Sequence, residues 1–104
     1  MLASITIPLL RSLMIAGLLA IAACQAAPPV QEMSDARQAI MAAKEAGAAE
    51  KAPDDLKAAE EHEQAAEDAL KEESYLRARR HAVLAKDKAL DALRRSKTET
   101  DAED

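Results

Sequence analysis

Small and apolar residues recur every three or four positions through much of this chain, which is the period of an amphipathic α-helix. The clearest series alternates steps of four and three residues: Ala78, Ala82, Ala85, Ala89, Ala92 and Ser96. We call this series the alanine seam. A seven-residue repeat of small side chains predicts a helix that packs closely on another helix. A row of larger apolar residues flanks the seam: Leu76, Val83, Leu90 and Leu93.

Two shorter series precede the seam and predict two more helices. The first helix is expected to begin at Ser34 or Asp35 and to end at Gly47, and its apolar face consists of Met33, Ala36, Ile40, Ala43 and Gly47. The second is expected to open at Pro53, whose missing N–H is harmless in a first helical turn. Its apolar face is the series Leu56, Ala59, Glu63, Ala66 and Leu70, beside a second row of Ala58, Ala65 and Ala69.

The periodicity slips between Lys71 and Tyr75, where neither glycine nor proline marks a break. We predict a turn there, with Ser74 capping the third helix, and the alternative is one continuous long helix. The fold class is therefore all-α, as a short helical hairpin or a three-helix antiparallel bundle with coiled-coil-like alanine packing. The folded part is expected to span residues 34–97, followed by a disordered acidic tail at 98–104.

Charge is distributed unevenly over the two later helices. Residues 50–73 carry ten acids and three bases, whereas residues 77–97 carry eight bases and two acids. This asymmetry favours an antiparallel pair of helices with complementary flanks. Each exposed ion pair contributes only about 0.2–1 kcal/mol, so charge selects the arrangement more than it stabilises it.

Composition limits what such a bundle can do. There is no Trp or Phe, Tyr75 is the only aromatic residue, and most of the apolar fraction is alanine. An enclosed apolar pocket for a small-molecule substrate is not expected, because the large side chains that line one are missing. All 19 acids follow Cys24 and only Arg11 of the 14 bases precedes it, so the segment after Cys24 is acidic overall. That balance argues against a nucleic-acid partner.

The amino-terminal segment ends at the only cysteine, Cys24. Arg11 is followed by an uncharged stretch and then by small residues, as in a secretory signal. The run Ile21-Ala22-Ala23-Cys24 resembles a bacterial lipoprotein signal, which implies cleavage between Ala23 and Cys24 and lipid attachment to Cys24. Gln25, rather than aspartate, follows the cysteine, and in Gram-negative lipoproteins this pattern implies export to the outer membrane. The alternatives are a transmembrane helix and an ordinary signal peptide with an incidental cysteine.

With this interpretation, residues 1–23 are the signal peptide and residues 24–33 are the lipidated amino terminus with a short tether. Two successive prolines, Pro28 and Pro29, favour an extended segment between lipid and domain. Two or three acyl chains hold a protein stably on a bilayer, because each buried methylene contributes about 0.8 kcal/mol.

The stretch from Ala36 to Leu93 resembles DUF4398, a small helical domain of unknown function found in Gram-negative envelope lipoproteins. The resemblance is carried by three groups of residues: Ala46-Gly47-Ala48, Ala52-Pro53-Asp54-Asp55-Leu56, and Tyr75-Leu76-Arg77-Ala78-Arg79. It implies an all-helical lipoprotein domain and supplies no catalytic residues. Residues 75–89 are also similar to part of a tetratricopeptide repeat, which implies helix-hairpin packing only, since about three repeats are needed for a stable solenoid.

Few residues are candidates for chemistry. His62 lies between Glu61 and Glu63, but neighbours in sequence point about 100° apart on a helix, so a metal site would need ligands three or four residues away. His81 lies beside Arg80, which disfavours a bound cation. We therefore predict no enzyme, no metal and no other cofactor. The basic residues of the third helix are candidates for anionic lipid head groups, although we expect them to face the acidic helix and water: Arg77, Arg79, Arg80, Arg94, Arg95 and Lys97.

Taken together, the sequence predicts a non-catalytic, lipid-anchored helical module of the periplasm. It would bind another envelope protein or a second copy of itself through the alanine seam and its flanks. An alternative is a structural envelope lipoprotein associated with peptidoglycan, and a hydrolase or metal-binding protein is the third possibility.

Overall fold

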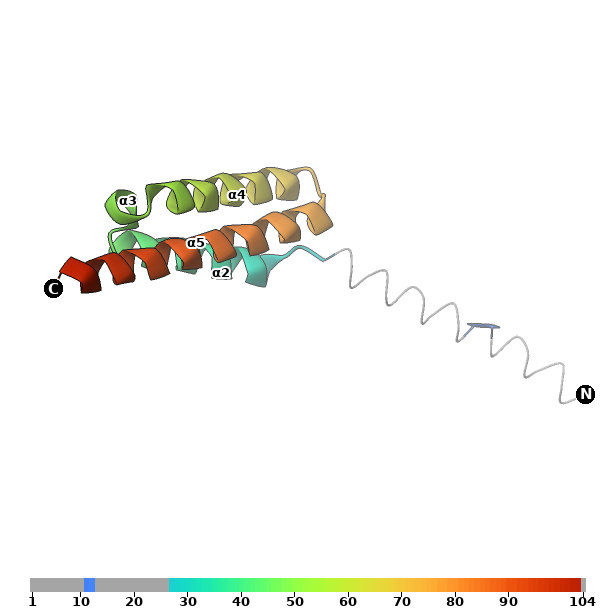
Figure 1. Ribbon diagram of the computed structural model, residues 1–104. Coiled ribbons are helices and arrows are strands. Elements are labelled where there is room, and N and C mark those ends of the chain that lie inside the picture. Colours follow the sequence, from blue (N-terminus) through green and yellow to red (C-terminus); the bar gives the residue numbers. More distant parts are fainter. Residues whose placement is uncertain (1–10, 13–26, 104) are drawn as a thin grey trace, which may run out of the picture.

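A computed structural model describes Arg11, Ser12 and residues 27–103. Three long helices pack side by side: α2 (Val30–Glu45), α4 (Pro53–Lys71) and α5 (Tyr75–Glu103) (Figure 1). A single helical turn, α3 (Ala48–Lys51), lies between α2 and α4. Neighbouring helices in sequence are antiparallel, so α2 and α5 run in the same direction, and no strand occurs among the described residues. The prediction of an all-α fold is confirmed, in its three-helix form.

Helix α2 begins earlier than expected, at Val30 instead of after Ser34 or Asp35. Pro29 occupies the capping position, and its carbonyl accepts the Met33 amide at 3.1 Å. The Asp35 carboxylate does not cap the helix but accepts a hydrogen bond from the Gln31 side chain at 2.8 Å. The folded part therefore starts before residue 34, and the last four residues assigned to the tether belong to the bundle.

Gly47 ends α2 as predicted. Its φ of +86° is left-handed, and its amide donates to the Lys44 carbonyl at 3.0 Å. The left-handed conformation reverses the chain into α3, a turn of helix that the sequence pattern did not predict. Pro53 is the first residue of α4 and two acidic residues follow it in the first turn, where the helix dipole favours negative charge.

A turn separates α4 from α5, and the alternative of one continuous helix is wrong. Glu73 has a φ of +59°, and its amide donates to the Leu70 carbonyl at 3.0 Å. The Ser74 amide reaches back to the Ala69 carbonyl at 2.9 Å. These two hydrogen bonds form a Schellman motif, which satisfies the last carbonyls of a helix. The motif normally contains glycine, so glutamate at its centre explains why the break had no clear signal in the sequence.

Gly47 and Glu73, the two residues with a left-handed backbone, are expected to respond to substitution with opposite changes in stability. Gly47→Ala should destabilise the bundle by about 1 kcal/mol, because a Cβ is disfavoured in this conformation. Glu73→Gly should stabilise it by about 0.5 kcal/mol, since relief of that strain exceeds the cost of a more flexible unfolded chain. Urea denaturation followed by circular dichroism measures both. If the two changes had the same sign, the assigned backbone conformations would be wrong.

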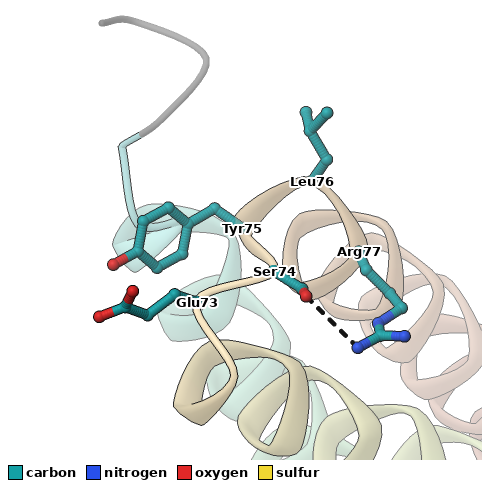
Figure 2. A pocket seen from close by; sticks show the side chains of 5 residues that line it. All are labelled: Glu73, Ser74, Tyr75, Leu76 and Arg77. Carbon is teal, nitrogen blue, oxygen red and sulfur yellow. Dashed lines mark hydrogen bonds between the residues drawn. The ribbon is translucent and has the colours of Figure 1, made fainter.

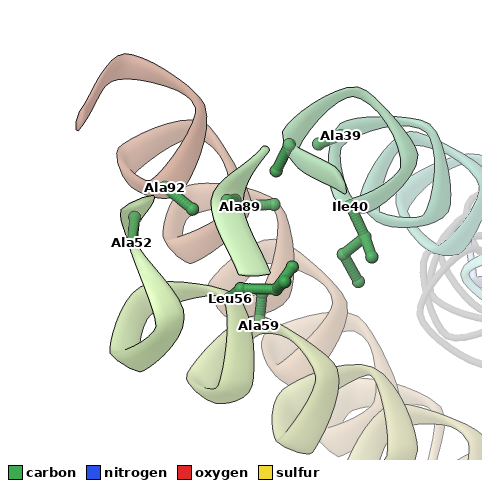
Figure 3. Close-up of a cluster of buried hydrophobic side chains, with 9 residues drawn as sticks. Ala39, Ile40, Ala52, Leu56, Ala59, Ala89 and Ala92 are labelled. Carbon is green, nitrogen blue, oxygen red and sulfur yellow. The ribbon is translucent and has the colours of Figure 1, made fainter. Parts of the chain in front are cut away.

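The alanine seam forms the centre of the bundle, as predicted. All six of its residues are buried, each with at most 1% of its surface exposed. Figure 3 shows the part of the core where Ala89 and Ala92 of α5 meet Ile40 of α2 and Leu56 of α4. Ser96 is accommodated because its hydroxyl donates to the Ala92 carbonyl at 2.8 Å. The core thus combines many methyl groups with few large side chains.

The expectation of a disordered tail at 98–104 is wrong for its described residues, because α5 continues to Glu103. Thr98 and Thr100 donate hydroxyl hydrogen bonds to the carbonyls of Arg94 and Ser96, each at 2.9 Å. Lys51 of α3 also donates to the Thr100 hydroxyl, which ties this part of α5 to the rest of the bundle. The acidic composition suggested disorder, but local hydrogen bonds continue the helix.

Candidate interaction surface

Ion pairs connect the helices, and α2 takes part in most of them. Its bases contact acids of α4, and its acids contact bases of α5. The pairs with α4 are Arg37–Glu63 (3.5 Å), Arg37–Glu67 (3.4 Å) and Lys44–Glu60 (2.6 Å). The pairs with α5 are Glu32–Arg79 (3.0 Å) and Asp35–Lys86 (3.8 Å). Helix α2 therefore pairs its charges with both of the other long helices.

The predicted charge complementarity between the second and third helices is only partly correct. Within the described part of the chain, Asp55–Arg95 at 2.9 Å is the ion pair that joins α4 to α5 along their length, and Glu72–Arg77 closes the turn between them. The predicted antiparallel packing of α4 on α5 is confirmed. Most of the ion pairs between helices nevertheless involve α2.

Four of the six candidate lipid-binding bases form ion pairs with carboxylates of the same molecule. Arg77, Arg79 and Arg95 form the pairs given above, and Arg94 pairs with Asp91 on its own helix. Each of these four guanidinium groups has a local counter-ion, so the basic composition of α5 does not produce one concentrated anion-binding surface. The expectation that these residues face acids and water is met for these four arginines.

His62 of α4 and His81 of α5 lie against each other, although the sequence analysis considered them separately. Their Nδ1 atoms are 3.2 Å apart, and their ring centroids are separated by 5.5 Å with the planes tilted by 30°. One ring can donate and the other accept, which gives a polar contact in the α4–α5 interface. His62 lies eleven residues before Glu73 and His81 lies eight residues after it, so equal spacing about the turn does not predict the pair. No group of three or more His, Cys, Asp or Glu residues in the described regions could hold a metal ion.

Two shallow hollows lie near the α4–α5 turn. The first is lined by Glu73, Ser74, Tyr75, Leu76 and Arg77. Figure 2 shows the Ser74 hydroxyl accepting a hydrogen bond from Arg77 at 3.4 Å, while Leu76 points away from both. The second is lined by Ala65, Asp68, Ala69, Glu72, Arg77 and His81. In neither hollow does the lining combine a nucleophile with a histidine base and an acid that orients it.

A row of exposed apolar side chains follows the outer face of α5. Leu76, Val83 and Leu90 recur every seven residues with 60%, 44% and 37% of their surfaces exposed, and Leu84 beside them is 37% exposed. The seam occupies the opposite side of the same helix. Of the four residues predicted to flank the seam, only Leu93 packs against the core.

The alanine seam itself is not available to a partner. Its residues are buried against α2 and α4, so binding another protein through the seam would require the bundle to open. The expectation of partner binding through the seam is therefore corrected, whereas the flanking residues Leu76, Val83 and Leu90 of the same expectation are exposed. Val30 and Met41 of α2 are also exposed, but they do not continue this row. We call Leu76, Val83, Leu84 and Leu90 the outer row.

Apart from Arg11 and Ser12, the predicted signal peptide lies outside the described residues, as do its cleavage position at Ala23 and the lipidation site Cys24. In the part of the chain that the structure describes, no helix combines the length and the hydropathy needed to cross a bilayer.

Comparisons with known proteins give one family. No curated protein and no solved structure matches the chain at a significant level. Residues 31–104 match the domain of unknown function DUF4398, and this match begins one residue into α2 and includes all of α3, α4 and α5. Since it covers well over half of the sequence, the chain belongs to the DUF4398 family.

Proposed function

We propose that this protein is a non-catalytic, lipid-anchored interaction module of the bacterial cell envelope. Cys24 would carry the lipid and attach the bundle to the outer membrane on its periplasmic side. The bundle would then present the outer row of α5 to another protein. The outer row is the observation that supports the interaction role. It exposes large apolar side chains to solvent, whereas the interior of the bundle is filled mostly with alanines.

Two sequence features support the anchor. Ile21-Ala22-Ala23-Cys24 resembles a lipoprotein signal, and the distance from Cys24 to the first residue of α2 is only six positions. A short connection that contains Pro28 and Pro29 would keep the bundle close to the membrane surface. At that surface a weak interaction gains strength from the high local concentration of anchored partners.

The anchor is tested by changing Cys24 to serine in the full chain. We expect Cys24→Ser to abolish labelling by radioactive palmitate and to move the protein from the washed membrane pellet to the soluble fraction, because no acyl chain would remain to partition into the bilayer. Ala27→Ser is the matched control, since it lies beyond the signal and should leave both properties intact. Unchanged pelleting of Cys24→Ser, or an unmodified Cys24 thiol in the wild-type protein, would contradict the proposal.

A further inference from the structure

The outer face of α5 carries two opposite charges beside the outer row. Arg80 and Asp87 are exposed, and neither forms an ion pair with another residue in the described part of the chain. They are seven residues, or about 10 Å, apart along the helix, which is too far for them to pair with each other. Six of the eleven other charged residues of α5 form an ion pair within the molecule. Arg80 and Asp87 form none there and lie beside the outer row, so they are available to a second surface.

We propose that the partner of this face is a second copy of the same chain, packed antiparallel along α5 with a two-fold axis beside Val83 and Leu84. The proposal deepens the proposed interaction role, on which it rests, by naming the partner.

The outer row is symmetric about Val83. Leu76 precedes Val83 by seven residues and Leu90 follows it by seven. In an antiparallel pair centred there, Leu76 of each copy lies near Leu90 of the other, and the two Val83 side chains meet at the axis. A two-fold interface requires a surface that is complementary to itself, and a row symmetric about its centre has that property.

The same axis brings the unpaired charges together. Arg80 precedes the axis by three to four residues and Asp87 follows it by three to four, so Arg80 of each copy faces Asp87 of the other. Both residues lie on the same side of the line through Leu76, Val83 and Leu90, between that line and Leu84, given the helical period of 3.6 residues. In an antiparallel pair of helices the same flank of each helix meets across the interface, which gives two Arg–Asp contacts.

A parallel pair does not achieve this match. It would bring the flank of Arg80 and Asp87 against the opposite flank, where Arg79 and Lys86 lie. Those two bases already contact Glu32 and Asp35 of α2. Asp87 would then compete for bases that have partners, and Arg80 would face positive charge. Charge therefore favours the antiparallel direction.

An anionic lipid surface is a poorer occupant of the same face. It would attract Arg80 but repel Asp87, which lies next to the apolar row. A second copy satisfies both charges at once. The interface is small, because four apolar side chains form its centre, and interfaces of this kind are weak. Confinement of both copies to one membrane by the proposed anchor would compensate for the low affinity.

Disulfide crosslinking in intact cells tests the arrangement with the full chain. We expect Val83→Cys to form a covalent homodimer on mild oxidation, since the two side chains meet at the axis. Lys57→Cys, on the exposed surface of α4, is the matched control and should remain monomeric. Membrane pelleting of the same samples reports the anchor separately, so loss of the anchor and loss of self-association are distinguished.

Charge reversal in the Val83→Cys background gives the decisive pattern. Arg80→Asp and Asp87→Arg should each reduce the crosslinked homodimer about tenfold, because each replaces two attractive contacts with two repulsive ones. The double variant should restore the homodimer, and co-expression of the two single variants, distinguished by mass tags, should give the mixed dimer. Both residues are exposed, so circular dichroism should show an unchanged fold.

Three results would overturn the proposal. The first is crosslinking of Val83→Cys no stronger than that of Lys57→Cys. The second is a crosslinked homodimer whose yield charge reversal does not change. Crosslinking of Val83→Cys to a protein of different mass, instead of to a second copy, would likewise assign the face to another partner. The third is binding of the Cys24→Ser protein to phosphatidylglycerol vesicles that is lost on Leu76→Ser, which would assign the face to lipid.

Discussion

Replacing Leu56 with alanine is expected to destabilise the bundle by about 2–5 kcal/mol, the usual cost of removing a buried leucine side chain. Leu56 is 6% exposed and lies in the cluster with Ile40, Ala59 and Ala89. Its neighbours are mostly alanines, whose short side chains cannot move to fill the space. A domain of this size has a total stability of about 4–11 kcal/mol, so the loss would be a large share of it.

The measurement is thermal and urea denaturation followed by circular dichroism at 222 nm, where helix is detected. A change of this size should lower the midpoint temperature by roughly 10–30 °C in a small domain. Met41→Ala is the matched control, because Met41 is 60% exposed on α2 and its removal should change the unfolding free energy by less than about 0.5 kcal/mol. Equal effects of the two changes would show that Leu56 is not part of a packed core.

The sequence predicted best those features that depend on one helix alone. All six seam positions are buried because a helix with a seven-residue repeat has one consistent inner face, whatever packs against it. Gly47 and Pro53 were placed correctly because each acts on its own backbone, the first through a left-handed φ and the second through a missing amide.

Features that depend on how α2 packs against the other two long helices were predicted less well. Charge composition predicted correctly that α4 and α5 form an antiparallel pair, but it did not show that α2 makes most of the ion pairs with them. The structure places Arg37 and Lys44 of α2 beside the acids of α4, and Glu32 of α2 beside Arg79 of α5. The start of α2 and the extension of α5 were also missed, because local hydrogen bonds outweighed the compositional signals for a tether and a tail.

The candidate surface shows why a sequence seam is ambiguous. A strip of alanines predicts close helix packing but does not distinguish an internal partner from an external one. In this protein α2 and α4 cover the seam, so the adjacent row of larger residues becomes the external surface. The contact between His62 and His81 was missed for a related reason, since it depends on the register across the turn rather than on spacing within one helix.

The internal position of the seam leads to the second expected result: Ala85→Leu should destabilise the bundle by about 1–3 kcal/mol. Ala85 has no exposed surface and faces the other helices at the middle of the seam. Three additional carbons there must either push α5 away from its neighbours or force strained rotamers. Leucine has nearly the same helix propensity as alanine, so loss of propensity cannot account for the effect.

Ala102→Leu provides the matched control on the same helix, because Ala102 is exposed near the carboxyl terminus. Urea denaturation should show a lower midpoint for Ala85→Leu and an unchanged midpoint for Ala102→Leu. A neutral Ala85→Leu would mean that the seam faces solvent, and the outer row of α5 could then no longer be distinguished from the core. The self-association proposed for α5 requires that Ala85→Leu lower the midpoint, since α5 must bury its seam inside the bundle in order to leave its outer row free for a second copy.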